Sequence, residues 1–370
     1  MKELLKELIQ AESTAESGEV AAANVVAARF RRSGVDARVD IWDDKRANVV
    51  AHVRSTSRRP ALLFVCHLDV VGPGEAKWSH PPFAAVETGG RVFGRGAADM
   101  KGGLAAAATA ICEVVESGIA LAGDIVFLGA AGEETDSAGA SRFIDQKDWL
   151  PELAGIVVPE PTDFAVVTAH RGLLWLQIAT KGKAAHSSTP ELGINAIGSM
   201  KRVLDNLENY RINAKPHRLL GQCSMSINTI SGGKALNIVP DECAIGIDIR
   251  TLPGQNHEEI IGDLKAILDG LRAGDPKFDA DIAMVRESGA LETASRCEFV
   301  SKFLDVVGAG ETKAVGFTTD GPQFVSLGAP IVIFGPGNPG FCHKADEYID
   351  ISDVEKAVGH YKDIILRFLV

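Results

Sequence analysis

The segment ALLFVCHLDVV, residues 61–71, is an apolar run that contains one histidine and one aspartate. Continuous apolar runs of this length are typical of a strand buried on both faces, as in a parallel sheet covered by helices. We therefore interpret the segment as a central strand. Side chains two residues apart on a strand share a face, so His67 and Asp69 are expected to point toward one site.

Helix-like and strand-like segments alternate on both sides of this central strand. Such alternation predicts an α/β fold in which a mixed sheet is sandwiched by helices. In chain order, the expected elements are a helix at 20–33, strands at 35–42 and 46–53, an Ala-rich helix at 102–117, and strands at 124–131 and 154–161.

The character of the sequence changes after residue 172, and a chain of 370 residues is long enough for two domains. Residues 173–287 predict strand, helix, two strands, helix and strand, the order of a two-layer α+β domain of the ferredoxin-like kind. The apolar strand PIVIFGPG and a closing helix from Ser352 then resume the earlier alternation. We therefore expect a discontinuous first domain, residues 1–172 and 288–370, with an inserted second domain, residues 173–287.

Composition and charge exclude several classes of function. The net charge of -11 and the lack of a Lys/Arg run make nucleic acid an unsuitable partner. No stretch approaches the ~18 consecutive apolar residues of a membrane-spanning helix, and the charged opening segment MKELLKELIQ lacks the apolar core of a signal peptide. Six cysteines without CxxC spacing indicate reduced thiols, so we expect a cytoplasmic protein.

Acidic and histidine side chains recur where predicted strands end, which is where α/β sheets place their sites. Taken singly, each has a simpler explanation, such as a helix N-cap for Asp99 or a solvated surface pair for Glu133 and Glu134. Their convergence on one sheet favours a metal site, because mixed nitrogen and oxygen ligands suit Zn, Co or Mn, and five ligands suggest two ions. The candidate ligands are His67, Asp99, Glu134, Glu160 and His343.

Glu133 and Glu134 directly follow the strand at 124–131. Two adjacent carboxylates at the end of a buried strand repel each other unless a cation or a proton lies between them. The pair could therefore divide the work, with one acid binding a metal ion while the other takes a proton from a bound water.

Eight motifs follow one another along the chain: HLDVV (67–71), Trp78 with PPF (81–83), GRGAADMKGG (94–103), GEE (132–134), EPT (160–162), HSSTPELGINAI (186–197), LNIVP (236–240) and HKADEY (343–348). In this order they resemble the M20 metallopeptidases, the group that contains acetylornithine deacetylase, succinyl-diaminopimelate desuccinylase, aminoacylases and glutamate carboxypeptidases. The resemblance spans essentially the whole chain.

The resemblance implies a catalytic domain like that of the dinuclear zinc aminopeptidases. Asp99 would bridge two zinc ions, with His67 and Glu160 on one ion and Glu134 and His343 on the other. Glu133 would be the general base, Asp69 would support His67, and the peptide bond after Asp99 is often cis in this family.

The resemblance also implies that the inserted domain is a lid through which a homodimer forms. His186 would reach the active site of the partner subunit and stabilise the oxyanion there. Planar Arg side chains suit a substrate carboxylate. The implied substrate-binding residues are Arg171, Asn237 and Arg250, with Thr318 and Asn338 as further candidates.

The expected activity is metal-dependent hydrolysis of an amide bond in an N-acyl amino acid. Two motifs differ on the acyl group, because HSSTPELGINAI looks like acetylornithine deacetylases whereas TTDG (318–321) and HKADE look like desuccinylases. A di- or carboxypeptidase acting on short peptides is the alternative within the same chemistry. A non-catalytic protein that binds an amino acid or peptide is the alternative from another class, and loss of a ligand or of the base would favour it.

Overall fold

The computed structural model describes residues 1–57 and 59–370 of the chain. The chain forms two units, each with its own sheet and its own buried apolar core. The first unit comprises Met1–Thr168, Thr293–Ala314 and Thr319–Val370, and the second comprises Ala169–Glu292 and Val315–Thr318.

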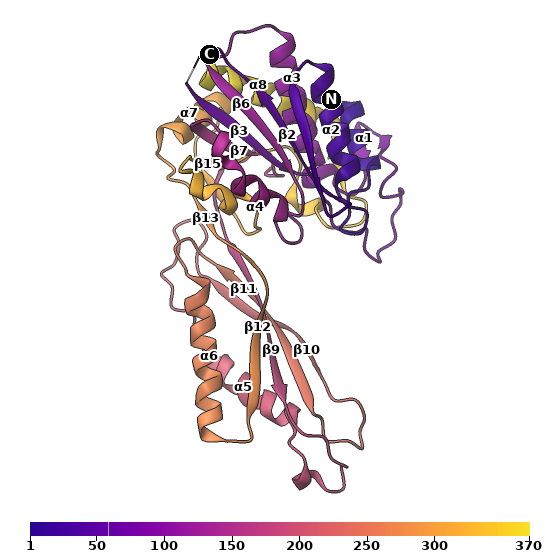
Figure 1. Cartoon of the computed structure of the whole chain (residues 1–370), viewed down its shortest axis with the longest axis vertical. Coiled ribbons are helices and arrows are strands. Elements are labelled where there is room, and N and C mark those ends of the chain that lie inside the picture. Colours follow the sequence, from indigo (N-terminus) through magenta and orange to yellow (C-terminus); the bar gives the residue numbers. More distant parts are fainter. Residues whose placement is uncertain (58) are drawn as a thin grey trace. The chain divides into compact units, whose positions relative to one another are not determined.

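A mixed sheet with the strand order β1-β2-β6-β3-β7-β15-β8 forms the centre of the first unit (Figure 1). Neighbours among β6, β3, β7 and β15 are parallel, and the remaining pairs in this order are antiparallel. Residues 61–67 of β3 are all buried, which explains the apolar run in the sequence. The bounds are β1 Asp36–Trp42, β2 Arg46–Val53, β3 Arg59–His67, β6 Gly123–Ala130, β7 Leu153–Val158, β8 Val167–His170 and β15 Ile331–Ile333, and β14 Lys313–Val315 pairs with β8.

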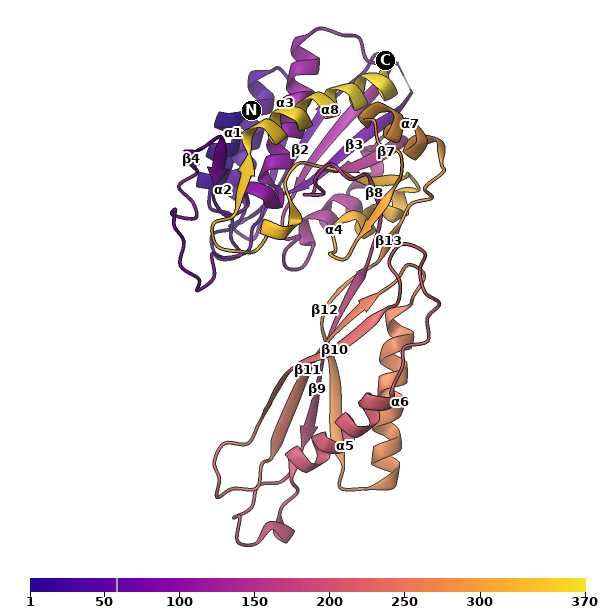
Figure 2. The same cartoon turned by 180° about the vertical axis from the view of Figure 1, so that it is seen from behind.

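Helices cover both faces of this sheet (Figures 1 and 2). Five helices share one apolar cluster with the sheet, whereas α4 lies on the opposite face, where Phe143 meets Phe324 with ring centroids 6.1 Å apart. The predicted sandwich of helices around a mixed sheet is therefore confirmed. The five helices are α1 Lys2–Gln10, α2 Val20–Arg32, α3 Gly102–Glu116, α7 Glu298–Val307 and α8 Ile351–Leu369, and α4 spans Ala138–Asp145.

Close approach of α3 to the end of β7 requires a glycine. A Cβ atom at Gly103 would lie 1.9 Å from the carbonyl oxygen of Pro159, far inside van der Waals contact. Because Pro159 precedes Glu160, the start of α3 packs directly against the segment that carries this candidate ligand.

Three short strands form a separate sheet in the order β16-β5-β4. Its register places Tyr348 opposite Phe93, so the HKADEY segment lies beside the chain that leads into Asp99. The peptide bond between Asp99 and Met100 is cis. The bounds are β4 Val86–Thr88, β5 Arg91–Phe93 and β16 Tyr348–Asp350.

The second unit is an antiparallel sheet in the order β10-β11-β9-β12, with helices α5 and α6 against one face (Figure 2). Alternate residues of β11 are buried against these helices, as expected for a strand with one covered face. This arrangement is the predicted ferredoxin-like α+β domain. The bounds are β9 Gly172–Lys181, α5 Ala196–Asn209, β10 Ser224–Gly232, β11 Glu242–Thr251, α6 His257–Gly274 and β12 Asp279–Ser288, and β13 Leu291–Glu292 pairs with the end of β8.

Among the helices of residues 1–57 and 59–370, none combines the length and the apolar character that crossing a membrane requires.

Candidate metal centre

The ends of three parallel strands deliver candidate ligands to one edge of the sheet. His67 is the last residue of β3, Glu134 lies shortly after β6, and Glu160 lies shortly after β7. Asp99 comes from the irregular turn Ala97–Lys101 that precedes α3, and its backbone (φ -117°, ψ 96°) is not helical. His343 follows the short 3-10 turn Pro339–Phe341. Residues from five separate segments thus reach a common point.

The carboxylate of Asp99 lies between two imidazoles. Its Oδ1 atom is 3.1 Å from Nε2 of His67, and its Oδ2 atom is 3.3 Å from Nε2 of His343. Each histidine also faces a second acid, since His343 Nε2 is 2.9 Å from Glu134 Oε1 and His67 Nε2 is 3.8 Å from Glu160 Oε1. The five side chains therefore form two halves that share Asp99.

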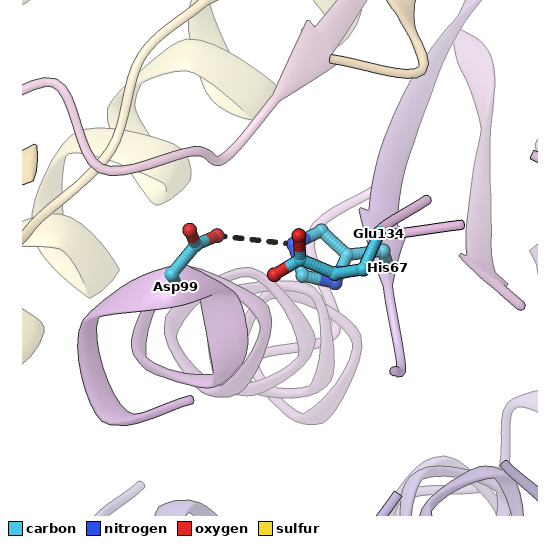
Figure 3. A group of neighbouring side chains, drawn as sticks. All are labelled: His67, Asp99 and Glu134. Atoms are coloured by element: carbon cyan, nitrogen blue, oxygen red, sulfur yellow. Dashed lines mark hydrogen bonds and ion pairs between the residues drawn. The ribbon is translucent and has the colours of Figure 1, made fainter. Parts of the chain in front are cut away.

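Three of these side chains could bind a single ion. One potential ligand atom each of His67, Asp99 and Glu134 lies within 4.8 Å of the others, and Figure 3 shows the carboxylate of Asp99 directed toward the imidazole. A set of imidazole nitrogens and carboxylate oxygens suits Zn, Co or Mn rather than an all-oxygen calcium site. The chemistry of the donor set therefore fits divalent transition-metal ions.

Electrostatics at this edge of the sheet favour a bound cation. Burial raises the pKa of Glu160 and of Glu133, and neighbouring carboxylates raise both pKa values further. Burial lowers the pKa of His67, but the charge of Glu160 and the hydrogen bond to Asp99 outweigh it and hold that pKa well above its usual value. Hydrogen bonds to Asp99 and Glu134 raise the pKa of His343 to about 10. These shifts report an excess of buried negative charge, which divalent cations would offset.

Asp69 holds the turn that carries Glu133 and Glu134. Its carboxylate accepts hydrogen bonds from the main-chain N–H groups of Gly132 (2.9 Å), Glu133 (3.1 Å) and Glu134 (3.0 Å). Its main-chain carbonyl accepts from Nδ1 of His67 at 2.8 Å, while the carboxylate is 3.7 Å from that nitrogen. The two groups of Asp69 thus serve different partners.

The expectation that strand geometry aligns His67 with Asp69 was wrong in its premise. Strand β3 ends at His67, so Asp69 lies beyond the strand and the two-residue alternation does not apply. The carbonyl of Asp69, rather than its carboxylate, lies nearest to the ring. This carbonyl still fixes which imidazole nitrogen faces the other ligands.

Four of the other predicted residues lie in the second unit. Arg171 donates to the main-chain carbonyl of Gln222 at 2.6 Å and also to that of Leu220, and Arg250 pairs with Asp248 at 2.8 Å and 3.1 Å. His186 and Asn237 are exposed. Nδ1 of His186 lies 2.8 Å from the hydroxyl of Ser188.

The last two predicted substrate residues lie in different units. Thr318 is half-buried and belongs to the short segment Val315–Thr318 of the second unit. Asn338, in the first unit, is exposed, and its side chain accepts from the N–H of Gly340 at 2.7 Å at the start of the turn before His343. Asn338 therefore has a local capping role in the turn that carries a candidate ligand.

Two further acids near the cluster were missed by sequence reasoning. Asp320, in the TTDG segment, is buried and is one cause of the raised pKa of Glu133. Glu347, in HKADEY, is fully buried, and its carboxylate accepts a hydrogen bond from the main-chain N–H of Asp99. Both acids belong to motifs that resemble those of the family, but only the fold reveals that their carboxylates are buried in the first unit.

Comparisons with known proteins match the chain to the M20 peptidases. A sequence model described as peptidase family M20/M25/M40 matches residues 63–367. A probable succinyl-diaminopimelate desuccinylase of Staphylococcus aureus strain N315 is 28% identical, with 99% of this chain and 97% of that protein covered. An acetylornithine deacetylase of Myxococcus xanthus is 30% identical, with 98% of this chain and 97% of that protein covered.

The fold has close counterparts among solved structures. An M20 family metallo-carboxypeptidase of Sulfolobus solfataricus aligns with a TM-score of 0.81 and 20% identity, covering 98% of each chain. At this identity the likeness concerns the fold, including the second unit.

Proposed function

Because the chain belongs to the peptidase family M20/M25/M40, whose members are metal-dependent hydrolases, we propose that it cleaves the amide bond of an N-acyl amino acid with two divalent ions. Zinc is the first choice, and cobalt or manganese is the alternative. The observation that carries the proposal is the carboxylate of Asp99, whose two oxygens face His67 and His343, each backed by a further acid.

Bound at this centre, the ions would lower the pKa of a water molecule toward ~7 and polarise the substrate carbonyl. Glu133 supplies the proton transfers. Its pKa is raised by burial and by the charges of Glu160 and Glu134, so its carboxylate is a stronger base than an exposed one. It takes a proton from the attacking water and returns it to the departing amine. Asp69 keeps Glu133 and Glu134 in place through their N–H groups.

The substrate class is inferred from the relatives and from the second unit. The two relatives are named for removal of succinyl and acetyl groups from amino acids, which supports a deacylase. The likeness to a metallo-carboxypeptidase keeps a peptidase as the second candidate. In either reaction Arg171, Asn237 and Arg250 would bind the carboxylate of the substrate, and Thr318 and Asn338 are further candidates.

A homodimer formed through the second unit is part of the proposal. His186 would then act on the oxyanion in the partner subunit, and its exposed side chain suits contact with another molecule. Light scattering that gives a monomeric mass for active enzyme would contradict this part while leaving the metal chemistry intact.

Replacement of Glu133 tests the proposed base. Glu133→Gln keeps the shape of the side chain but cannot take a proton, so kcat should fall by roughly 10²–10⁴-fold. Metal content, measured by atomic emission, should stay at the wild-type value. Asp136→Asn, at an exposed position in the same loop, is the control and should keep near-normal activity. Turnover by Glu133→Gln within threefold of wild type would remove Glu133 as the base.

A panel of N-acetyl, N-succinyl and N-formyl amino acids and dipeptides tests the reaction class. The protein is stripped with a chelator and assayed with and without added Zn²⁺ or Co²⁺. Metal-restored release of one amino acid supports the deacylase, and cleavage confined to dipeptides supports the peptidase. Two bound ions with no turnover of any compound would favour a non-catalytic binding protein.

A further inference from the structure

Two main-chain N–H groups at the turn that carries Asp99 share one side-chain acceptor. The N–H groups of Ala98 and Asp99 donate to Oε1 of Glu347 at 2.9 Å and 3.1 Å. Glu347 has no exposed surface. Ala98 and Asp99 precede helix α3, whose N-cap is Lys101, so their N–H groups lie outside the helix and this carboxylate satisfies them.

The second oxygen of Glu347 is bound to Arg95. Nη1 of Arg95 lies 2.5 Å from Oε2, and both side chains are almost fully buried, at 3% and 0% exposure. The guanidinium also lies over the ring of Trp78, 5.1 Å from its centroid. All three described partners of the carboxylate are hydrogen-bond donors, so both of its oxygens are used.

The main chain of Glu347 is itself fixed. Its carbonyl oxygen accepts from the N–H of Gly94 at 2.9 Å, and the next residue, Tyr348, pairs with Phe93 across strands β16 and β5. Glu347 is therefore held by a strand pairing on one side and by a buried cation on the other. Together, the strand pairing and the ion pair with Arg95 fix the position of the turn at Asp99.

We propose that Glu347, anchored by Arg95, is a positioning residue that holds Asp99 where its carboxylate spans the two histidines. This inference rests on the proposed function, in which Asp99 bridges two ions. Glu347 contacts no candidate ligand side chain in the described contacts and acts through the backbone. It has the same relation to Asp99 that Asp69 has to Glu133 and Glu134, so two of the ligand-bearing turns are each held by a buried carboxylate.

The first experiment compares Glu347→Gln with wild type in Zn²⁺ affinity and in the visible absorption of the Co²⁺-loaded protein. The amide cannot satisfy the two N–H groups and Arg95 together, so Asp99 loses its fixed position. Loss of such an outer contact typically lowers metal affinity by roughly 10–100-fold. The Co²⁺ spectrum, which reports ligand geometry, should change at saturating metal, and kcat should fall more than KM rises.

Asp350→Asn is the matched control. It removes the ion pair between Asp350 and Arg91, which joins the same two strands at 3.0 Å but is only half-buried and lies at the opposite end of their pairing from Tyr348 and Phe93. Its metal affinity and Co²⁺ spectrum should equal those of wild type. A purely structural role for Glu347 predicts a lower melting temperature with unchanged affinity and spectrum, and that result overturns the proposal.

Glu347→Asp keeps the buried charge and provides a second test if the Gln variant does not fold. Shortening by one methylene withdraws the oxygens from the two N–H groups, so Zn²⁺ affinity should still fall at least fivefold. Wild-type affinity in a folded Glu347→Asp protein overturns the inference. If wild type itself binds no pair of ions, the proposed function fails instead, so the two failures are distinguishable.

Discussion

Glu19 places a carboxylate where solvent barely reaches it, at 2% exposure, with Oε2 3.2 Å from Nε of Arg46. Burial raises the pKa of Glu19 to about 7, and the nearby charge of Asp69 adds to the shift. The attraction of Arg46 does not compensate, since Arg46 also pairs with Asp136. At neutral pH this residue is therefore close to its titration point.

The free energy of unfolding should consequently depend on pH through Glu19. Between its ordinary pKa of 4.5 and about 7, the folded chain keeps a proton that the unfolded chain has released, so raising the pH through this window lowers stability. The contribution is complete below pH 4.5, is lost as pH rises through about 7, and is on the order of 3 kcal/mol at most. Glu19→Gln lacks it.

Thermal melts of the chelated protein at pH 5 to 8 measure this effect. The melting temperature of Glu19→Gln, relative to wild type, should increase as the pH rises. Glu16→Gln, at an exposed neighbouring position, should show no such trend. Parallel pH curves for wild type and Glu19→Gln would show that Glu19 does not titrate in this window.

Three of the candidate ligands could be predicted because each follows an apolar strand that the sequence displays plainly. His67, Glu134 and Glu160 lie at strand ends, and a common sheet edge then implies that they meet. Glu347 and Arg95 could not be predicted in the same way. They are charged residues in loops, and nothing local distinguishes a buried ion pair from an exposed one.

At the scale of elements, helix α3 and the end of β7 approach so closely that no space remains between them for one additional methyl group. Gly103→Ala would direct its Cβ at the carbonyl of Pro159, and the neighbouring Glu160 would have to shift. We expect a loss of about 1–3 kcal/mol in the free energy of unfolding, together with weaker Zn²⁺ binding.

Urea unfolding and metal titration of the Gly103→Ala variant check this expectation. Gly359→Ala is the control, because it lies inside helix α8 with no atom within 4 Å of the added methyl group. Helix propensity predicts that this control gains about 0.5–1 kcal/mol. Equal effects of the two substitutions would show that α3 has room to move.

Elements with strong periodicity were predicted well, and those that depend on distant partners were not. Strand β2 has the predicted bounds, because an apolar run marks it locally. The three-residue strands β4, β5 and β16 were missed, since Phe93 pairs with Tyr348 far along the chain. Helices α4 and α7 were also missed, and both are short. Local signals cannot report long-range pairing.

For the whole molecule, two separate apolar cores predict two unfolding transitions. All five candidate ligands belong to the first unit, so bound ions stabilise that unit alone. Removing two ions, each present at 100 times its dissociation constant, costs about 2.7 kcal/mol per ion, or about 5.4 kcal/mol together, which lowers one melting temperature by roughly 10–20 °C. The other transition should stay in place.

Differential scanning calorimetry with and without a chelator measures the two transitions. Asn195→Ala identifies the second unit, because its side chain caps helix α5 by accepting from Gly198 at 3.0 Å. This variant should lower only the chelator-insensitive transition, by about 1 kcal/mol. A single transition that moves as a whole under both treatments would mean that the units unfold together.

A ribosome synthesises four of the five proposed ligands before the inserted unit and the fifth only after it. Roughly 180 residues separate Glu160 from His343, and at 5–20 residues per second their translation takes roughly 10–40 s. During this time the nascent chain already contains His67, Asp99 and Glu160. In the proposed centre these three residues would offer ligands to one ion while translation continues, whereas the other ion would require His343. The order of the ligands along the chain would therefore set which ion binds first.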